Sequence, residues 1–149
     1  MYNSREIGEL RADVAVNCRT LIERAAARGL PVLVVQTVRD VEYQRYLVSM
    51  GYAARTATVP TFHAKGVGLA FDICKNMKGH EYDDPGFFTA MGRLGKEMGF
   101  TWGGDWRSFP DRPHFQWDGG GKYTSSMVRA GRYPPPMPRF EDEETMTQE

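Results

Sequence analysis

The sequence has no excess of charge of either sign. Its 149 residues carry 19 Lys and Arg against 19 Asp and Glu. A chain without a global field has no general attraction for nucleic acid or for an anionic membrane surface, so we expect neither as a partner. There is also no apolar stretch long enough to span a bilayer, and no basic start followed by an apolar run. We therefore expect a protein that is made in the cytoplasm without a signal peptide.

Cysteine is scarce as well. The two cysteines, Cys18 and Cys74, lie far apart in the sequence, and Cys18 is on the apolar face of an expected helix. We interpret Cys18 as a small buried thiol, and the fold as one that requires no disulfide. A chain of this length fits one domain with a single core of ordinary size.

Two segments have the apolar periodicity of helices. The first follows Ser4, its expected cap, and ends before Gly29, with apolar positions at Ile7, Leu10, Val14, Cys18, Leu21 and Ala25. The second starts at Asp84 and Pro85 and closes at Gly99. Its stripe is expected to be core and consists of Phe87, Met91, Leu94 and Met98.

Four segments are expected to be strands: residues 30–37, 68–74, 100–102 and 114–117. The first is a nearly unbroken apolar run, which predicts a strand covered on both faces. The second alternates large apolar residues with smaller or polar ones, so that one face packs and the other carries Asp72. With a further short helix capped by Asp40, this order predicts an α+β fold with a small, mainly antiparallel sheet flanked by helices.

The composition changes at Tyr133. Four prolines follow within six residues, and then an acidic run from Glu141 to Glu144. This segment offers little that could form a core. We therefore expect one domain of residues 1–132 and a disordered tail of residues 133–149.

Histidine occurs only three times, and two of the three lie in segments that also carry carboxylates. A catalytic zinc ion takes three protein ligands from His, Asp, Glu or Cys and keeps a fourth position for water. His63, Asp72 and His114 would supply that set. Either segment by itself would more often be a surface pair or a satisfied core pair. His80 has no such context and is expected on a solvated turn.

Hydrolysis at such an ion also needs a group that takes the proton of the water and passes it to the leaving amine. Asp111, three residues before His114 and next to a stiff Arg-Pro step, is the candidate. The loop of residues 103–113 contains two further groups of interest. We expect Asp105 to hold His114 through a hydrogen bond, and Trp106 to line the cleft, while Trp102 and Trp117 pack in the core.

Three segments together resemble the zinc peptidases of the VanY carboxypeptidase superfamily: residues 61–63, 68–72 and 99–116. The last is most similar to the L-alanyl-D-glutamate endopeptidases of phage endolysins and bacterial cell-wall hydrolases. The resemblance extends from the first helix to about residue 130. It implies the hedgehog-like fold of DD- and LD-carboxypeptidases. It also implies one Zn²⁺ ion held by His63, Asp72 and His114, with Asp111 as the acid and base.

The resemblance also implies two substrate-binding residues. Arg39, in a Thr-x-Arg context, corresponds to an arginine that contacts a substrate carboxylate or carbonyl, although a salt bridge to Asp40 or Glu42 is an alternative. Thr61 takes the place of a serine commonly found two residues before the first His. One feature departs from the family: the step from His63 to Asp72 is two residues longer than usual. We expect the extra Val-Gly pair to form a bulge in the approach to the strand, which leaves the ligand set intact.

The function that these expectations favour is a zinc-dependent peptidoglycan hydrolase that cuts stem peptides, between L-Ala and D-Glu. The alternatives are a D-alanyl-D-alanine carboxypeptidase or dipeptidase, and a non-catalytic wall-binding or phage structural module of the same fold. We expect a monomer that acts on the cell wall after release through a membrane lesion of the holin type.

Overall fold

The computed structural model describes residues 3–52 and 61–140 and contains a four-stranded antiparallel sheet. Its strands are β1 (Val32–Gln36), β2 (Ala70–Lys75), β3 (Thr101–Trp102) and β4 (His114–Gln116), in the order β1-β2-β4-β3. The helices are α1 (Ala12–Ala27), α2 (Val41–Ser49), α3 (Pro85–Glu97) and α4 (Ser125–Arg129). The expected α+β fold is confirmed.

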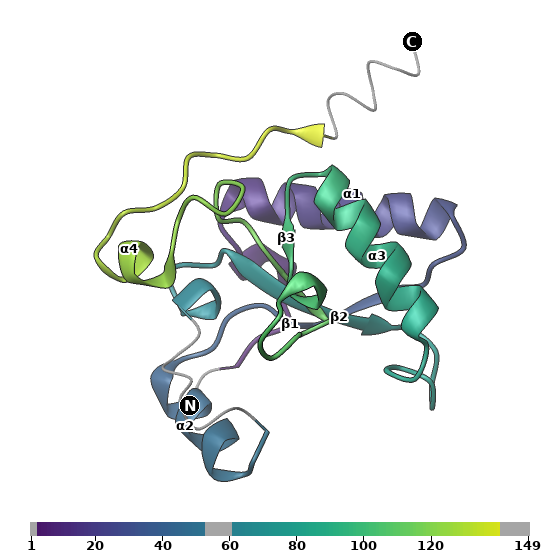
Figure 1. Cartoon of the computed structure of the whole chain (residues 1–149), viewed down its shortest axis with the longest axis horizontal. Coiled ribbons are helices and arrows are strands. Elements are labelled where there is room, and N and C mark those ends of the chain that lie inside the picture. The colour runs from purple at the N-terminus through teal and green to yellow at the C-terminus, as the bar shows by residue number, and fades with distance from the viewer. Residues whose placement is uncertain (1–2, 53–60, 141–149) are drawn as a thin grey trace.

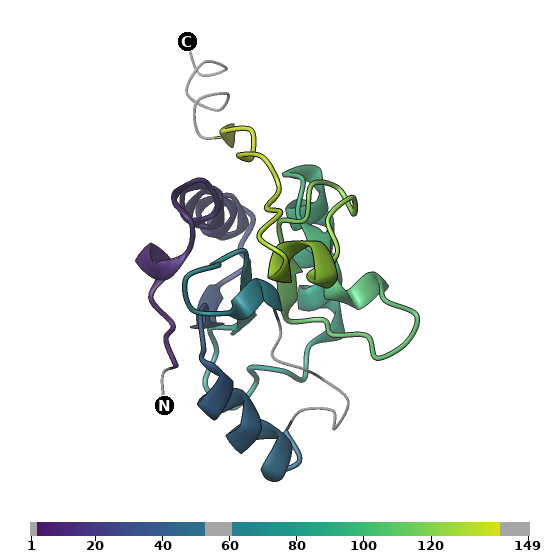
Figure 2. The ribbon, with the colours of Figure 1, turned by 90° about the vertical axis from the view of Figure 1, so that its left-hand side faces the viewer.

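Helices α1 and α3 lie on one side of the sheet, and α2 lies on the other (Figure 1). Figure 2, turned by 90°, shows the same separation of α1 from α2. No helix in residues 3–52 or 61–140 is long and apolar enough to cross a membrane.

The core lies between the sheet and the helices α1 and α3. Phe71 of β2 stacks on Phe115 of β4, with ring centroids 5.6 Å apart, and both are fully buried. Helix α3 can approach the sheet closely because two of its residues are glycines. A Cβ atom at Gly95 would lie only 2.5 Å from the ring of Phe115, and one at Gly92 would overlap the ring of Trp102. The two glycines therefore make room for large aromatic rings of β3 and β4.

Helix α3 is the element that the sequence predicted best. Asp84 caps it by accepting a hydrogen bond from the backbone N–H of Phe87, and the expected apolar stripe is buried. The short helix α2 is likewise capped by Asp40, whose carboxylate accepts from the N–H of Tyr43. Both helices begin where a carboxylate satisfies a free N–H group of the first turn.

Helix α1 begins at Ala12, so the expected start just after Ser4 is wrong. The backbone of Ser4 instead pairs with the chain beyond β1: its N–H donates to the carbonyl of Val38, and its carbonyl accepts from the N–H of Thr37. These long-range bonds satisfy the peptide groups that a helix would have used. The expected core positions from Leu10 to Ala25 are nevertheless buried.

Strand β1 is not covered on both faces, as the apolar run suggested. It is an edge strand, and Leu33 is 36% exposed while the next residue, Val34, is 7% exposed. Since α1 and α3 cover only one face of the sheet, the side chains of an apolar run that point the other way stay partly in solvent.

The segment from Tyr133 to Phe140 is ordered, which corrects the expected boundary at residue 132. Met137 is 3% exposed and belongs to the core, and its N–H donates to the Asp13 carboxylate. The segment is rich in proline, so its carbonyls have few N–H partners of their own. They accept instead from side chains of Arg11, Asn17, Arg24 and Trp117. The acidic residues 141–149 lie outside the described residues.

Candidate metal centre and its cleft

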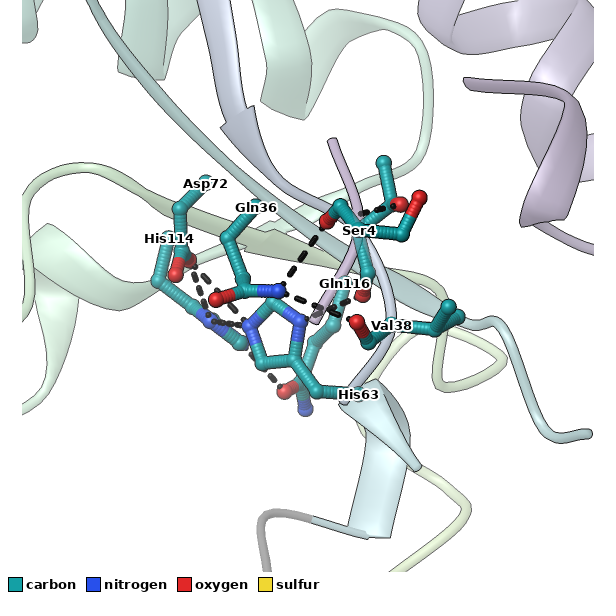
Figure 3. Close-up of polar contacts among 8 residues, drawn as sticks. Ser4, Gln36, Val38, His63, Asp72, His114 and Gln116 are labelled. Atoms are coloured by element: carbon teal, nitrogen blue, oxygen red, sulfur yellow. Dashed lines mark hydrogen bonds and ion pairs between the residues drawn. The ribbon is translucent and has the colours of Figure 1, made fainter. Parts of the chain in front are cut away.

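Three side chains from separate elements meet on the face of the sheet that faces α2. Asp72 of β2 and His114 of β4 are direct neighbours in the antiparallel register, and His63 ends a short 3-10 helix, η2 (Thr61–His63). The His63 Nε2 atom lies 3.2 Å from His114 Nδ1 and 3.3 Å from Asp72 Oδ1. The distance from His114 Nδ1 to Asp72 Oδ1 is 3.1 Å. Figure 3 shows the two rings directed toward each other beside the carboxylate.

The remaining ring nitrogens fix where the protons lie. His63 Nδ1 is 2.8 Å from the backbone carbonyl of Thr37, and a carbonyl can only accept, so this nitrogen carries the hydrogen. His114 Nε2 is 2.8 Å from the Gln116 side-chain oxygen and donates to it in the same way. When both rings are neutral, the two nitrogens that face each other, His63 Nε2 and His114 Nδ1, therefore each carry a lone pair and no hydrogen.

Three lone pairs, two from imidazoles and one from a carboxylate, thus converge on one point. His63 is 1% exposed and His114 is 6% exposed. Buried acceptors without a donor are costly, and a cation between them removes that cost. Two His nitrogens and one Asp oxygen, all within 4.8 Å of one another, fit the ligand set of a dication such as zinc.

The charges in the cluster are strongly coupled. Burial by itself raises the pKa of Asp72, but the imidazoles of His63 and His114 outweigh it and hold that pKa well below its usual range. For His114, burial lowers the pKa, while the hydrogen bond and charge of Asp72 raise it, with a net upward shift. A metal ion therefore competes with a proton for this ring, so metal affinity should fall as the pH falls.

Asp111 lies on the loop that leads into β4 and lines the same cleft. Its N–H donates to the carbonyl of Gly103, and its own carbonyl accepts from the N–H of His114. A Cβ atom at Gly103 would overlap the backbone of Asp111. The tight turn therefore ties the position of Asp111 to that of His114.

Burial is the main cause of a raised pKa at Asp111. The charge of Asp72 adds to the rise, and His114, His63 and Arg39 oppose it. A carboxyl group that is easier to protonate than usual suits a role in which a proton is first accepted and then donated.

The cleft around these groups has a volume of about 610 Å³. Arg39 lines it, and its backbone pairs with that of His63, since the Arg39 N–H donates to the His63 carbonyl. The Nε atom of Arg39 is buried and has no hydrogen-bond partner in the described residues. Burial lowers the pKa of this guanidinium, against the charges of Asp72, Tyr43 and Asp111.

Gln44 is a candidate functional residue that the sequence reasoning missed. It lies on α2, lines the cleft and is 3% exposed, yet neither its side-chain oxygen nor its nitrogen has a hydrogen-bond partner among the described residues. A buried amide with both ends unpaired is rare, and this one could pair with a donor and an acceptor of a molecule in the cleft. A glutamine on a short helix carries no such signal in the sequence.

Two expectations about the loop before β4 have different outcomes. Asp105 does not hold His114: its carboxylate pairs with Lys96 at 2.9 Å on the surface, and Gln116 contacts the ring instead. The carboxylate of Asp105 is about half exposed, so solvent and Lys96 are its partners. Trp106 does line the cleft, and its ring lies 5.0 Å from the ring of His114.

Other expected positions agree with the structure. Trp102 and Trp117 are buried in the core, and His80 lies on an exposed turn beside Asp83. Thr61 is buried, lines the cleft and accepts a hydrogen bond from Arg129 of α4.

The long step from His63 to Asp72 is absorbed before β2 begins. Residues 64–67 form a turn in the approach to the strand, where the bulge was expected, and a bond from the Val67 N–H to the Ala64 carbonyl closes it. Gly68 has φ +60°, and a Cβ there would lie 2.8 Å from the Arg11 nitrogen. The extra residues therefore leave the pairing of β2, and with it Asp72, undisturbed.

Fold and site together define an α+β domain with a His-Asp-His group that could hold a metal ion, and an adjacent carboxylate, on the open face of a small sheet. A model of peptidase family M15, described as D-alanyl-D-alanine carboxypeptidase, matches residues 54–117. The L-alanyl-D-glutamate peptidase of Listeria phage A118 is 29% identical over 133 residues, which are 85% of this chain and 45% of that protein. The chain thus spans about half the length of this relative.

A second relative and two solved structures agree. The peptidoglycan L-alanyl-D-glutamate endopeptidase CwlK of Bacillus subtilis is 28% identical over 123 residues, 72% of this chain and 73% of that protein. The L-Ala D-Glu endopeptidase ChiX of Serratia marcescens has a TM-score of 0.57 at 22% identity, over 78% of this chain and 88% of the other. A zinc complex of the D,D-pentapeptidase VanY has a TM-score of 0.56 at 15% identity, over 87% and 84%. The chain is therefore similar to VanY-like zinc peptidases in both sequence and fold.

Proposed function

We propose that the protein is a zinc-dependent peptidoglycan hydrolase that cuts the stem peptide between L-Ala and D-Glu. The observation that carries this proposal is the convergence of three lone pairs, two of them on buried imidazoles, with Asp111 in one cleft. The two curated relatives, both named for L-alanyl-D-glutamate cleavage, support the choice of bond.

His63 Nε2, Asp72 Oδ1 and His114 Nδ1 would hold one zinc ion. Bound there, the ion would supply Lewis acidity to the peptide carbonyl and make an adjacent water more acidic. Asp111 takes the proton of the attacking water and returns it to the departing nitrogen. Its raised pKa favours the first of these transfers, because it makes the carboxylate a stronger base.

Arg39 and Gln44 are proposed to orient the substrate. The Arg39 guanidinium suits a carboxylate or carbonyl of the stem peptide, because its planar fork of donors matches two acceptor atoms. The unpaired amide of Gln44 has the donor and acceptor that a peptide group requires.

Two further groups shape the same cleft. The ring of Trp106 forms a wall beside His114, where it can contact the stem peptide. The bond from Arg129 holds Thr61, which also lines the cleft, at the start of η2. One chain supplies all these groups, so we propose that it acts as a monomer, on cell wall reached after release through a membrane lesion.

The alternative is cleavage of a terminal D-Ala, as in a D-alanyl-D-alanine carboxypeptidase. It is favoured by the description of the matching family model and by the half-buried Arg39, which would suit a terminal carboxylate. A non-catalytic wall-binding module would have no need of a carboxylate such as Asp111 beside the metal ligands.

Mass spectrometry of purified muropeptides, digested with the zinc-loaded protein, separates these readings. Cleavage after L-Ala leaves fragments that begin with D-Glu, whereas the alternative removes single D-Ala residues. His63→Ala, which lacks one proposed metal ligand, is the inactive control. Release of no fragment by the zinc-loaded wild type would contradict both enzymatic readings.

A further inference from the structure

We propose that Asp118 makes His114 competent to bind a metal ion by fixing, through Gln116, which ring nitrogen carries the proton. Asp118 does not itself contact His114; its carboxylate bonds to Thr101, Gln116 and Gly121. It acts as a positioning residue at the end of a buried chain of hydrogen bonds that starts at the ring. The proposal concerns metal binding and holds whichever peptide bond is cut.

The chain of bonds is short and continuous. His114 Nε2 lies 2.8 Å from the Gln116 side-chain oxygen, and the Gln116 side-chain nitrogen donates to Asp118 Oδ2 at 2.9 Å. The other oxygen, Oδ1, accepts from the Thr101 hydroxyl at 2.7 Å and from the Gly121 backbone N–H at 2.8 Å. His114, Gln116 and Asp118 are all buried, at 6%, 9% and 4% exposure.

The elements of the fold determine this arrangement. His114 and Gln116 share a face of β4 because side chains alternate along a strand. Thr101 of β3 is the partner of Gln116 in the antiparallel register, which brings the Thr101 hydroxyl beside Asp118. After β4, three glycines at positive φ turn the backbone so that the Gly121 N–H points back at Asp118.

The groups around Asp118 determine which partner donates in each hydrogen bond of the series. A backbone N–H can only donate, and a carboxylate accepts at both oxygens. Asp118 therefore requires Gln116 to present its NH₂ group, and the amide oxygen of Gln116 must then face His114. The ring consequently carries its hydrogen on Nε2 and keeps a lone pair on Nδ1, the atom that faces His63 and Asp72.

The opposite orientation of the amide would be incompatible with a metal ion. A rotated Gln116 would present its NH₂ group to Nε2, and the ring would hold its hydrogen on Nδ1, where the ion has to bind. His63 needs no such device, because the carbonyl of Thr37 cannot be turned into a donor. Both imidazoles thus direct a lone pair at the metal position. For His63 a backbone carbonyl fixes the ring hydrogen, whereas for His114 a side chain, which can be replaced, does so.

Asp118→Asn tests the proposal with almost no change of shape. The Thr101 and Gly121 donors keep an oxygen at the Oδ1 position, so the new NH₂ group faces Gln116. Two donors then oppose each other, and Gln116 rotates. We expect zinc affinity, measured by competition with a chromophoric chelator, to fall by about 10- to 100-fold, as for lost outer partners of metal ligands.

A second variant separates polarity from a folding defect. In Gln116→Glu/Asp118→Asn, the new carboxylate accepts from both the amide at position 118 and His114 Nε2, so the productive ring form returns. We expect zinc affinity within a few fold of wild type, although position 118 is the same as in the weak variant. Asp105→Asn, which changes a surface carboxylate nearby, is the matched control and should bind zinc as wild type does.

The ring form can also be observed without any metal. Long-range ¹H–¹⁵N NMR spectra of the wild type should show the hydrogen of His114 on Nε2, and those of Asp118→Asn should show it on Nδ1. Unchanged spectra and zinc affinity in Asp118→Asn would overturn the proposal, as would a double variant no better than the single one. A wild type that fails to bind zinc would instead contradict the proposed function, and the spectra would still decide the role of Asp118.

Discussion

The two faces of the same strands differ in what stabilises them. Toward α1 and α3, β2 presents Phe71 and Ile73, and β4 presents Phe115, all fully buried. Toward the cleft, the intervening positions carry Asp72 and His114. Because side chains alternate along a strand, one short segment contributes to both the core and the site.

The covered face depends on packing that has no direction, whereas the cleft face depends on directed bonds between donors and acceptors. A change of shape should therefore affect the first, and a change of polarity the second. The cleft face also carries acceptors that repel one another until a cation or a proton lies between them. The following predictions test this division, from the largest expected effect to the smallest.

Asp111→Asn should affect chemistry alone. Without a group that accepts and returns the proton, the rate of muropeptide cleavage should fall by about 10²- to 10⁴-fold, while zinc content and melting temperature stay as in the wild type. Asp105→Asn, in the same loop but paired with Lys96 on the surface, should cleave at the normal rate. A normal rate of cleavage by Asp111→Asn would show that Asp111 is not the group that transfers the proton.

Removal of zinc should destabilise the fold through the cleft face. At a free zinc concentration 1,000 times the dissociation constant, binding adds about 4 kcal/mol to the free energy of unfolding. Thermal unfolding followed by circular dichroism should show a fall in melting temperature when a chelator is added. Asp72→Asn should lose this dependence on zinc, and a wild type that melts at the same temperature with and without zinc would contradict the metal site.

Ile73→Val changes the neighbouring position on the covered face. The loss of one buried methyl group should lower the free energy of unfolding by about 1 kcal/mol. Denaturant unfolding should show this loss equally with and without zinc, and muropeptide cleavage well below the melting temperature should be unchanged. A drop in zinc affinity would mean that the two faces are not separable.

Asp13→Asn tests the polar contacts that hold the segment from Tyr133 to Phe140 on the outside of α1. Burial by itself raises the pKa of Asp13, but bonds from Arg11 and the Met137 N–H outweigh it and lower that pKa below its usual value. Its contribution is thus present above about pH 4 and is lost as the pH falls through the lowered pKa. At pH 7 the variant should be less stable by up to about 1 kcal/mol, since the group is partly solvated.

The comparison of wild type and Asp13→Asn across pH is the measurement. Urea unfolding at pH 7 should separate the two proteins, and the difference should shrink below pH 4. Zinc-loaded turnover at pH 7 should be the same in both, because the segment lies away from the cleft. A difference that grows on acidification would show that the pKa of Asp13 is raised instead.

Local patterns were sufficient for some elements. The stripe of α3 and its Asp84 cap were predicted because periodicity and capping depend on residues within one or two turns. The alternation of β2 likewise predicted that Asp72 faces away from the core. The start of α1 and the path of residues 133–140 were not predicted, because both depend on hydrogen bonds to residues far away in the sequence.

The site shows the same division. His63, Asp72, His114 and Asp111 stand out in the sequence, since few residue types can bind zinc or move a proton and this chain has only three histidines. Gln44 and the pair of Gln116 and Asp118 do not stand out, because amides and carboxylates are common on surfaces. Their significance comes from burial and from the partners that they have or lack.

The sequence by itself determined which residues can bind a cation, because ligand chemistry belongs to the side chain. Only the tertiary structure decided that three of them share one point, that the ring nitrogens present lone pairs there, and that Asp105 is replaced by Gln116 as the partner of His114. The physical reason is that proton positions and burial follow from contacts between distant segments, which no local pattern records.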